Sequence, residues 1–383
     1  ASYYFSQDIL DNFDLVAWDP RGTGESLPFV DCVDNFDKYF AVDLSPNSPA
    51  DKKNLVDMAK EFNAGCVERS GDILKYISTV NSAGDMDSIR KALNVDKISY
   101  FGFSYGSELG AVWATLYPQT VRAAVLDGAS DPLANSLDKT MAQAAGFESQ
   151  LDEFLNYCSN RPTCLFNNDM KSAQALDELF IKADLSPVSN TRVPITNGVL
   201  FMGIVTALYS SSQWDYLGKA LYDLQLGDGA GILSLYDSYF QYDAFTNTYG
   251  NELEAFFAIS CLDDKGPNSV ASVDANVAKF VEVAPRLGLG FSYGYFCALW
   301  PEDSQPKLQV SGVGAGTIVV VGTTGDAATP LESSAKMAAA LENGILVVVE
   351  ADRHTGYNLN KCINKVVDTY LIKLTAPAPS TRC

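Results

Sequence analysis

Short apolar runs alternate with helical patterns over the first third of the chain. Residues 13–18, 98–101 and 121–126 are compact apolar runs, whereas residues 85–93 and 105–117 carry the spacing of amphipathic helices. Strands that alternate with helices are typical of a parallel sheet covered on both faces. The pattern therefore predicts such a sheet, with residues 13–18 as a buried strand that runs into a turn.

The hydrophobic pattern changes at about residue 131 and changes back at about residue 310. Between these points helical spacing dominates, and Tyr, Phe and Trp are frequent. We therefore expect a mainly helical cap at residues 131–310, inserted between two parts of an α/β core, residues 1–130 and residues 311–383. The helices predicted in the cap cover residues 137–157, 173–183, 199–209, 214–224, 232–239 and 273–283.

Strand patterns return in the last part of the chain. Residues 317–321 and 345–349 are apolar runs of strand length, residues 331–341 between them have helical spacing, and a last helix is predicted at residues 362–374. Together the two outer parts predict a mostly parallel central sheet with helices on both faces.

One short motif points to nucleophilic catalysis. Residues 102–106 read Gly-Phe-Ser-Tyr-Gly, a G-x-S-x-G pattern, between a predicted strand and a predicted helix. In that context the pattern indicates a nucleophile elbow, a tight turn whose glycines avoid clashes and which exposes the serine hydroxyl. The helix N-terminus beneath the serine favours a developing negative charge. Ser104 is therefore the candidate nucleophile.

A serine hydroxyl is a weak nucleophile at neutral pH and needs a base beside it. His354 is the single histidine of the chain and follows the predicted strand at residues 345–349, so it is the candidate base. The third member is expected to be an acid between the serine and the histidine in the chain. Asp326 follows the predicted strand at residues 317–321 and is favoured over Asp352, which lies only two residues from the histidine.

The chain resembles the α/β-hydrolases of the proline iminopeptidase-like group, and more narrowly the secreted tripeptidyl aminopeptidases. The resemblance rests on residues 13–26, 100–110, 125–128, 258–263 and 325–330, and so spans nearly the whole sequence. It implies the α/β-hydrolase fold and hydrolysis of peptide bonds near a free N-terminus, through an acyl-enzyme on the serine. Among these matches, the cap segment and the cysteine pattern are what point to the tripeptidyl branch.

One departure from the family concerns the oxyanion hole. Members carry a His-Gly-Gly-Pro-Gly-like loop, and the first strands of the sheet, upstream of the segment that matches residues 13–26. With that loop missing here, the backbone N–H of Tyr105 is the one oxyanion donor expected. Either a cleaved N-terminal chain of the same precursor stays bound, or the fragment is inactive. We favour the bound chain, because missing core strands expose a large apolar face.

An aminopeptidase must hold a protonated α-amine at a fixed distance from its nucleophile. A buried carboxylate is the natural partner, since a charge-assisted hydrogen bond is strong and specific. Asp263 is the first candidate and Glu254 the second, with solvated surface acids as the alternative. Aromatic residues of the cap are candidates for an apolar pocket or for ordinary core: Trp214, Tyr236, Tyr239, Phe240, Tyr242 and Phe245.

Charge narrows the classes of partner. The chain has 27 basic and 47 acidic residues, a net charge of −20, which repels phosphate backbones and anionic headgroups. Nucleic acid and membrane surfaces are therefore poor partners, and cationic or amine-bearing ligands suit the chain better. The alternative is that the excess of acidic residues only keeps the protein soluble. No cofactor motif is present, and a single histidine without a Cys-x-x-Cys pair makes a metal site unexpected.

The eight cysteines favour an oxidising compartment. We expect four disulfides between sequence neighbours and a secreted or otherwise extracytoplasmic protein, with buried free thiols as the alternative. The short 158–164 loop is the best supported pair. The predicted pairs are Cys32–Cys66, Cys158–Cys164, Cys261–Cys297 and Cys362–Cys383.

Two other functions remain open at this point. A carboxylesterase or lipase uses the same three residues on the same fold, and fold alone does not separate these classes. A catalytically dead hydrolase that serves as a binding module has the same motifs without turnover. A serine exopeptidase that releases short peptides is the function favoured by the resemblance.

Overall fold

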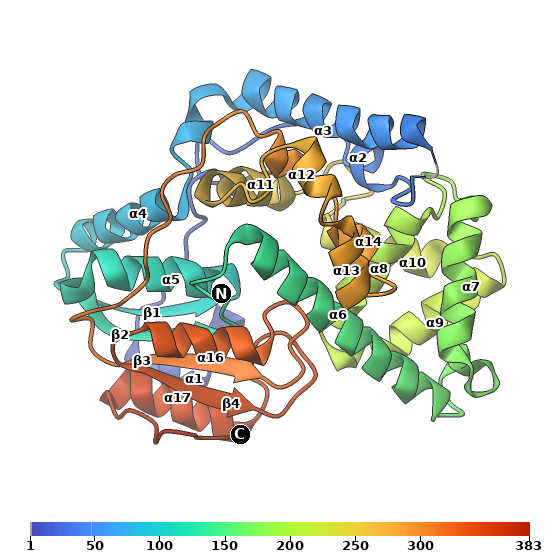
Figure 1. The fold of residues 1–383 in the computed structure, drawn as a ribbon. Helices are drawn as coiled ribbons and strands as arrows, with labels where there is room; N and C mark the ends of the chain where they lie inside the picture. Colours follow the sequence, from blue (N-terminus) through green and yellow to red (C-terminus); the bar gives the residue numbers. More distant parts are fainter. Residues whose placement is uncertain (1, 47) are drawn as a thin grey trace.

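Four parallel strands form the central sheet of the computed structural model, which describes residues 2–46 and 48–383. Their order across the sheet follows the chain (Figure 1). Val125 lies opposite Phe101 on one side and Val319 on the other. The strands are β1 (Ile98–Phe103), β2 (Val121–Asp127), β3 (Ile318–Thr323) and β4 (Gly344–Val349). The predicted parallel α/β sheet is confirmed, and all four carboxyl ends lie at one edge.

Helices cover both faces of this sheet, as expected for parallel strands. Successive strand residues point to opposite faces, so Ala124 and Leu126 pack into one apolar cluster and Ala123 and Val125 into the other. The first cluster is covered by α4 (Thr79–Ala92), α5 (Tyr105–Leu116) and α16 (Leu331–Ala340). The second is covered by α1 (Gln7–Asn12) and α17 (Lys361–Lys373).

The prediction of a buried strand at residues 13–18 is wrong. The segment is irregular and pairs with no strand among the described residues, and Val16 is 51% exposed. A strand needs a neighbour that takes up its backbone N–H and C=O groups. The next strand in the chain, β1, ends the described sheet and pairs only with β2. The apolar run alone therefore does not make a strand here.

The cap lies above the carboxyl edge of the sheet in Figure 1 and is built from helices. Its core contains Phe154, Leu200 and Leu221 from three of these helices. The predicted helix at residues 273–283 is two helices, because the chain turns at Ala275 and Asn276. The cap helices are α6 (Ser136–Ser159), α7 (Ser172–Leu185), α8 (Asn197–Leu208), α9 (Trp214–Gln225), α10 (Ala230–Tyr239), α11 (Glu252–Asp263), α12 (Val270–Asp274), α13 (Val277–Val283), α14 (Gly288–Phe291) and α15 (Tyr295–Ala298).

An early segment of the chain packs on the cap rather than on the sheet. Helix α3 (Pro49–Ser70) lies across α11, after the short helix α2 (Asp37–Phe40) (Figure 1). Phe62 on α3 is fully buried in one cluster with Ala258 on α11. The side of the cap above α5 is therefore closed by residues that precede the sheet in sequence.

All eight cysteines are paired, and the four predicted disulfides are confirmed. One bridge closes a short loop and three close longer ones, and each restricts the unfolded chain and so stabilises the fold. Among the described residues no helix is both long and apolar enough to cross a bilayer. The pairs are Cys32–Cys66, Cys158–Cys164, Cys261–Cys297 and Cys362–Cys383.

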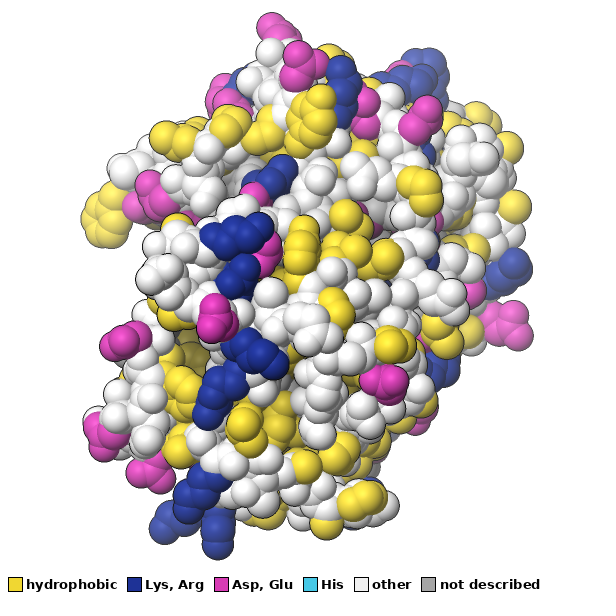
Figure 2. All heavy atoms as spheres, turned by 90° about the vertical axis from the view of Figure 1, so that its left-hand side faces the viewer, with side chains coloured by type: hydrophobic (Ala, Val, Ile, Leu, Met, Phe, Trp, Pro, Cys, Tyr) yellow, Lys and Arg dark blue, Asp and Glu magenta, His cyan; other side chains and the backbone are white. Residues whose placement is uncertain are grey.

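The surface charge is unevenly distributed. Figure 2 shows one face on which Lys and Arg side chains follow a broken line from top to bottom, with apolar and acidic side chains beside them. The net charge of −20 is therefore not spread uniformly over this face.

Candidate active site

Ser104 stands at the turn between β1 and α5. Its φ of 53° and ψ of −121° lie in a strained region for a residue with a side chain, as a nucleophile elbow requires. The turn is close: a Cβ on Gly102 would come within 2.2 Å of the Gly106 carbonyl oxygen. The Ser104 N–H donates to the carbonyl oxygen of Asp127 at 2.8 Å. The elbow is thus anchored to β2, and the Ser104 hydroxyl makes no hydrogen bond within the described residues.

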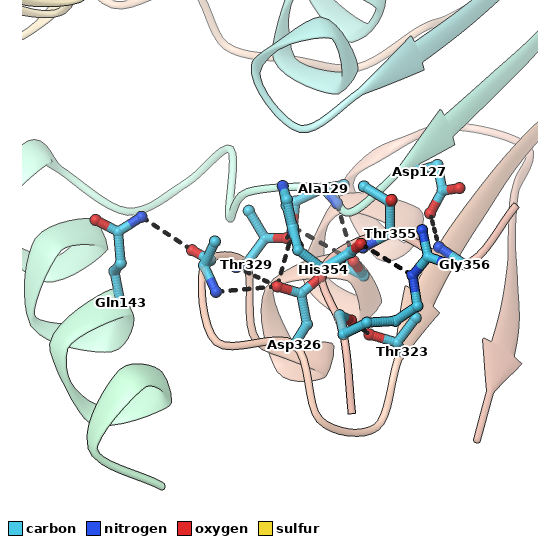
Figure 3. Close-up of polar contacts among 12 residues, drawn as sticks. Asp127, Ala129, Gln143, Thr323, Asp326, Thr329, His354, Thr355 and Gly356 are labelled. Atoms are coloured by element: carbon cyan, nitrogen blue, oxygen red, sulfur yellow. Dashed lines mark hydrogen bonds and ion pairs between the residues drawn. The ribbon is translucent and has the colours of Figure 1, made fainter. Parts of the chain in front are cut away.

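His354 and Asp326 meet at the carboxyl edge of the sheet, on the loops that follow β4 and β3. The His354 Nδ1 lies 2.9 and 3.0 Å from the two carboxylate oxygens of Asp326 (Figure 3). A carboxylate accepts, so Nδ1 carries the proton and Nε2 is left as the basic nitrogen. The Nε2 atom is buried and has no hydrogen-bond partner among the described residues. Its lone pair is therefore not taken up by another described group of the protein.

The Asp326 carboxylate is itself held by its own loop. It is almost fully buried and accepts the N–H groups of Ala328 and Thr329 at 3.0 and 2.8 Å and the Thr329 hydroxyl at 3.0 Å. These donors fix the carboxylate and through it the imidazole ring. Asp352, the other acid considered, is exposed, and no hydrogen bond joins its carboxylate to His354 within the described residues. The structure thus brings Asp326, and not Asp352, to the imidazole.

A second buried acid supports the histidine loop from behind. Asp127, at the end of β2, accepts the N–H group of Gly356 at 2.7 Å (Figure 3). It also accepts the N–H group of Tyr357 at 2.7 Å. Burial raises the pKa of Asp127 to about 6, against the lowering effect of these two bonds. Sequence reasoning gave this residue no role, although a single acid that ends an apolar strand was a usable signal.

A cleft of about 270 Å³ opens beside the elbow, between the sheet edge and the cap. Ser104, Tyr105 and Thr329 line it, and so do Thr79 and Asp263. Tyr105 is the first residue of α5, where backbone N–H groups have no intrahelical partner. Its N–H is therefore a free donor next to Ser104.

Asp263 lies on α11, at the wall of this cleft. Its carboxylate accepts the Thr79 N–H at 3.0 Å and the Thr79 hydroxyl, whose oxygen is 2.8 Å from the Tyr105 phenol oxygen. Burial raises the pKa of Asp263 to about 6, and the nearby Glu108 adds to the rise while Lys139 opposes it. A cation bound beside Asp263 would stabilise the ionised form of its carboxylate.

Glu254, the second acid predicted for amine binding, lies elsewhere. It is 3% exposed, and one carboxylate oxygen accepts the N–H groups of Cys32 and Val33 at 3.0 and 2.8 Å. It is not among the described residues that line the cleft. Burial raises the pKa of Glu254 to about 7. The structure separates the two acids: Asp263 faces the cleft, and Glu254 joins α11 to the segment beneath α3.

The aromatic residues singled out in the cap do not form one group. Tyr239 and Phe240 line a second cavity, whereas Trp214 and Tyr236 are buried in the core of the cap. The other two, Tyr242 and Phe245, belong to the loop after α10, and Phe245 is fully exposed.

Among the described side chains, no group of three His, Cys, Asp or Glu residues is arranged to hold a metal ion.

Comparison with known proteins places the chain among hydrolases. Residues 284–383 match the family model described as TAP-like protein. Serine protease Hip1 of Mycobacterium tuberculosis is 33% identical over 98% of this chain and 75% of its own length. Carboxylesterase B of the same species is 35% identical, over 98% and 74%. The tripeptidyl aminopeptidase of Streptomyces lividans is 31% identical, over 97% and 70%.

Proposed function

Because this chain belongs to the TAP-like α/β-hydrolases, we propose that it is a secreted serine exopeptidase that releases short peptides from free N-termini. The observation that carries the proposal is the half-buried Asp263 carboxylate in the same cleft as Ser104. The name of the tripeptidyl aminopeptidase relative agrees with it. Four disulfides support an oxidising, extracytoplasmic location.

In the proposed reaction, the Ser104 hydroxyl oxygen attacks the scissile carbonyl carbon while Nε2 of His354 takes the hydroxyl proton. Asp326 holds the ring and stabilises the imidazolium that forms. The carbonyl oxygen becomes an oxyanion, which the Tyr105 N–H and the N-terminus of α5 stabilise. No hydrogen bond joins Ser104 and His354 among the described residues, and such bonds often tighten only when substrate is bound.

The tetrahedral intermediate then breaks its carbon–nitrogen bond. The His354 imidazolium gives its proton to the departing amine, and the N-terminal part of the substrate stays bound as an ester on Ser104. A water molecule then adds its oxygen to the ester carbonyl while His354 takes a proton from it. The ester bond breaks, and His354 returns that proton to the Ser104 oxygen, which becomes a hydroxyl again. The enzyme returns to its starting state and the released peptide carries a free carboxylate.

Asp263 supplies the selection for a free amine. A protonated α-amine next to this carboxylate forms a charge-assisted hydrogen bond inside the cleft. An acetylated N-terminus brings no charge, so the desolvated carboxylate keeps its two bonds from Thr79 but gains no counter-charge, which is unfavourable. The cleft therefore favours peptides that begin near Asp263 and rejects blocked ones.

The test compares peptide arylamides that differ only in N-terminal acetylation. Wild-type protein should cleave the free form with a kcat/KM about 10- to 100-fold higher than that of the acetylated form. Asp263→Asn should remove most of this preference but leave hydrolysis of nitrophenyl acetate almost unchanged. Glu252→Gln is the matched control, because Glu252 is exposed on the same helix and is not among the described residues that line the cleft. Equal cleavage of both peptides by wild-type protein would contradict the exopeptidase assignment.

A carboxylesterase is the second candidate, and the similarity to carboxylesterase B favours it. Ester hydrolysis without cleavage of free-amine peptides would select this reading. A catalytically dead binding module is the third. Labelling of Ser104 by a fluorophosphonate probe would exclude it, because only an activated serine reacts.

A further inference from the structure

A second cavity, of about 300 Å³, lies between the cap helices and the early segment that contains α2 and α3. Aromatic and aliphatic side chains dominate its wall, among them Phe201, Met202, Val205, Phe240 and Phe257. We call it the aromatic chamber. Lys265 is the one charged side chain among the described residues that line it, and Asp303 lies 3.4 Å from its ammonium group. Protein interiors are otherwise close-packed, so an apolar space of this size is suited to a ligand.

The aromatic chamber adjoins the cleft that holds Ser104. The two spaces share the same border residues, which come from one face of each of two helices. Helix α6 provides three of them at helical spacing, and α11 provides two that are four residues apart. Apart from one phenylalanine they carry hydroxyl or amide groups. The shared residues are Ser136, Thr140, Gln143, Phe256 and Ser260.

The border lies within reach of a substrate bound as proposed. Along α11, Ser260 and Phe256 precede Asp263 by three and seven residues, on the same side of the helix. A rise of 1.5 Å per residue places them about 5 and 10 Å from Asp263 along the helix axis. An extended peptide advances about 3.3–3.6 Å per residue. A side chain in the first residues of a peptide held at Asp263 can therefore cross the border.

We propose that the aromatic chamber binds a large apolar group on the acyl side of the scissile bond. The position of the chamber relative to the substrate rests on the proposed function, whereas its preference for apolar groups follows from the residues that line it. Two sources supply such a group: an aromatic or long aliphatic side chain of the released peptide, or the acyl chain of an ester. A charged side chain would lose its water in the chamber and find only Lys265, which is already paired with Asp303.

Two substrate pairs test the chamber and separate these sources. The first pair is nitrophenyl acetate and nitrophenyl octanoate. The second is a trialanine arylamide and its variant with one alanine replaced by phenylalanine, both with a free N-terminus. Wild-type protein should prefer the larger member of at least one pair by about tenfold or more in kcat/KM. Preference in the ester pair alone identifies an acyl chain, and preference in the peptide pair alone identifies a side chain.

Met202→Trp fills the chamber from α8, and Val283→Trp is its control. Met202 is half-buried in the chamber wall, whereas Val283 is 41% exposed on α13 and is not among the residues that line either space. Met202→Trp should bring the ratio of large to small substrate close to one, and Val283→Trp should keep the wild-type ratio. Val205→Trp fills the same space if the first variant does not fold.

A binding measurement without turnover completes the test. Ser104→Ala protein should bind the neutral fluorophore phenylnaphthylamine, and Met202→Trp in that background should weaken binding about tenfold. The proposal is overturned if wild-type protein shows no preference in either pair, or if filling the chamber changes neither the ratio nor the binding. Failure to cleave the free-amine peptides together with a strong octanoate preference would reject the exopeptidase assignment and support the chamber.

Discussion

The Asp127 carboxylate receives the backbone N–H of Gly356 at 2.7 Å, two residues beyond His354. The backbone carbonyl oxygen of Asp127 accepts the N–H of Ser104 at 2.8 Å. One residue at the end of β2 therefore contacts the backbone of the nucleophile and the backbone of the histidine loop. A displacement of β2 would move both together.

Asp127→Asn should lower kcat by about 10²-fold with little change in KM, because misplacement of a catalytic group by about 1 Å has effects of that size. An amide accepts through only one of its two end atoms, so one of the two N–H bonds to the histidine loop is lost. Steady-state kinetics with a peptide arylamide measures the effect. Asp368→Asn is the control: this buried carboxylate contacts Tyr357 through the phenol and not through the backbone. A similar loss of kcat in both variants would reduce Asp127 to a general stability role.

Ser104→Ala and His354→Ala should each lower kcat by several orders of magnitude, about 10⁴–10⁶-fold. The double variant should be no worse than the single ones, because members of such a group act as one unit. Rates measured with the nitrophenyl ester, together with circular dichroism to establish folding, check this. A His354→Ala protein that kept more than a tenth of the activity would contradict the assignment of the base.

Cleavage of free-amine peptides should decline relative to ester hydrolysis as the pH falls through about 6. The pKa of Asp263 is raised to about 6 by burial, so the carboxylate is ionised above that pH and binds the ammonium, and it is neutral below it. Glu108 raises that pKa further, and Lys139 lowers it. The ratio of the two kcat/KM values between pH 5 and about 7 isolates Asp263, since both substrates need the same base and the α-amine of the peptide stays protonated in this range. In Asp263→Asn the ratio should be independent of pH, and a persistent slope would assign the titration to another group.

Glu254 should make wild-type stability fall with rising pH in a defined window. Its folded-state pKa is about 7 and its ordinary value is 4.5, so its contribution is complete below about 4.5 and is lost as the pH rises through about 7. The free energy of unfolding in urea, measured for wild-type protein and Glu254→Gln at pH 4.5 and pH 8, reveals it. The difference in unfolding free energy between wild-type protein and Glu254→Gln should become less favourable to wild-type protein from pH 4.5 to pH 8. An advantage that stays constant or grows would contradict the raised pKa.

The local parts of the site could be predicted from the sequence, because their geometry is local. The glycines around Ser104 permit a tight turn, and the apolar runs before Asp326 and His354 place both on loops at the same sheet edge. The strand expected at residues 13–18 failed because pairing depends on a neighbour, which composition does not reveal. The contrast between Asp263 and Glu254 was equally hidden: both lie on α11, and only the packing of distant segments decides which acid faces the cleft.

The placement of the four disulfides has a mechanical consequence. Cys32–Cys66, Cys158–Cys164 and Cys261–Cys297 each tie together segments of the cap or of the layer that packs on it, and Cys362–Cys383 fastens α17 to the chain end beside β4. Each bridge thus stiffens one side of the cleft. Among the described residues no disulfide joins the two sides, so their relative position depends on non-covalent contacts and on the chain segments that connect them.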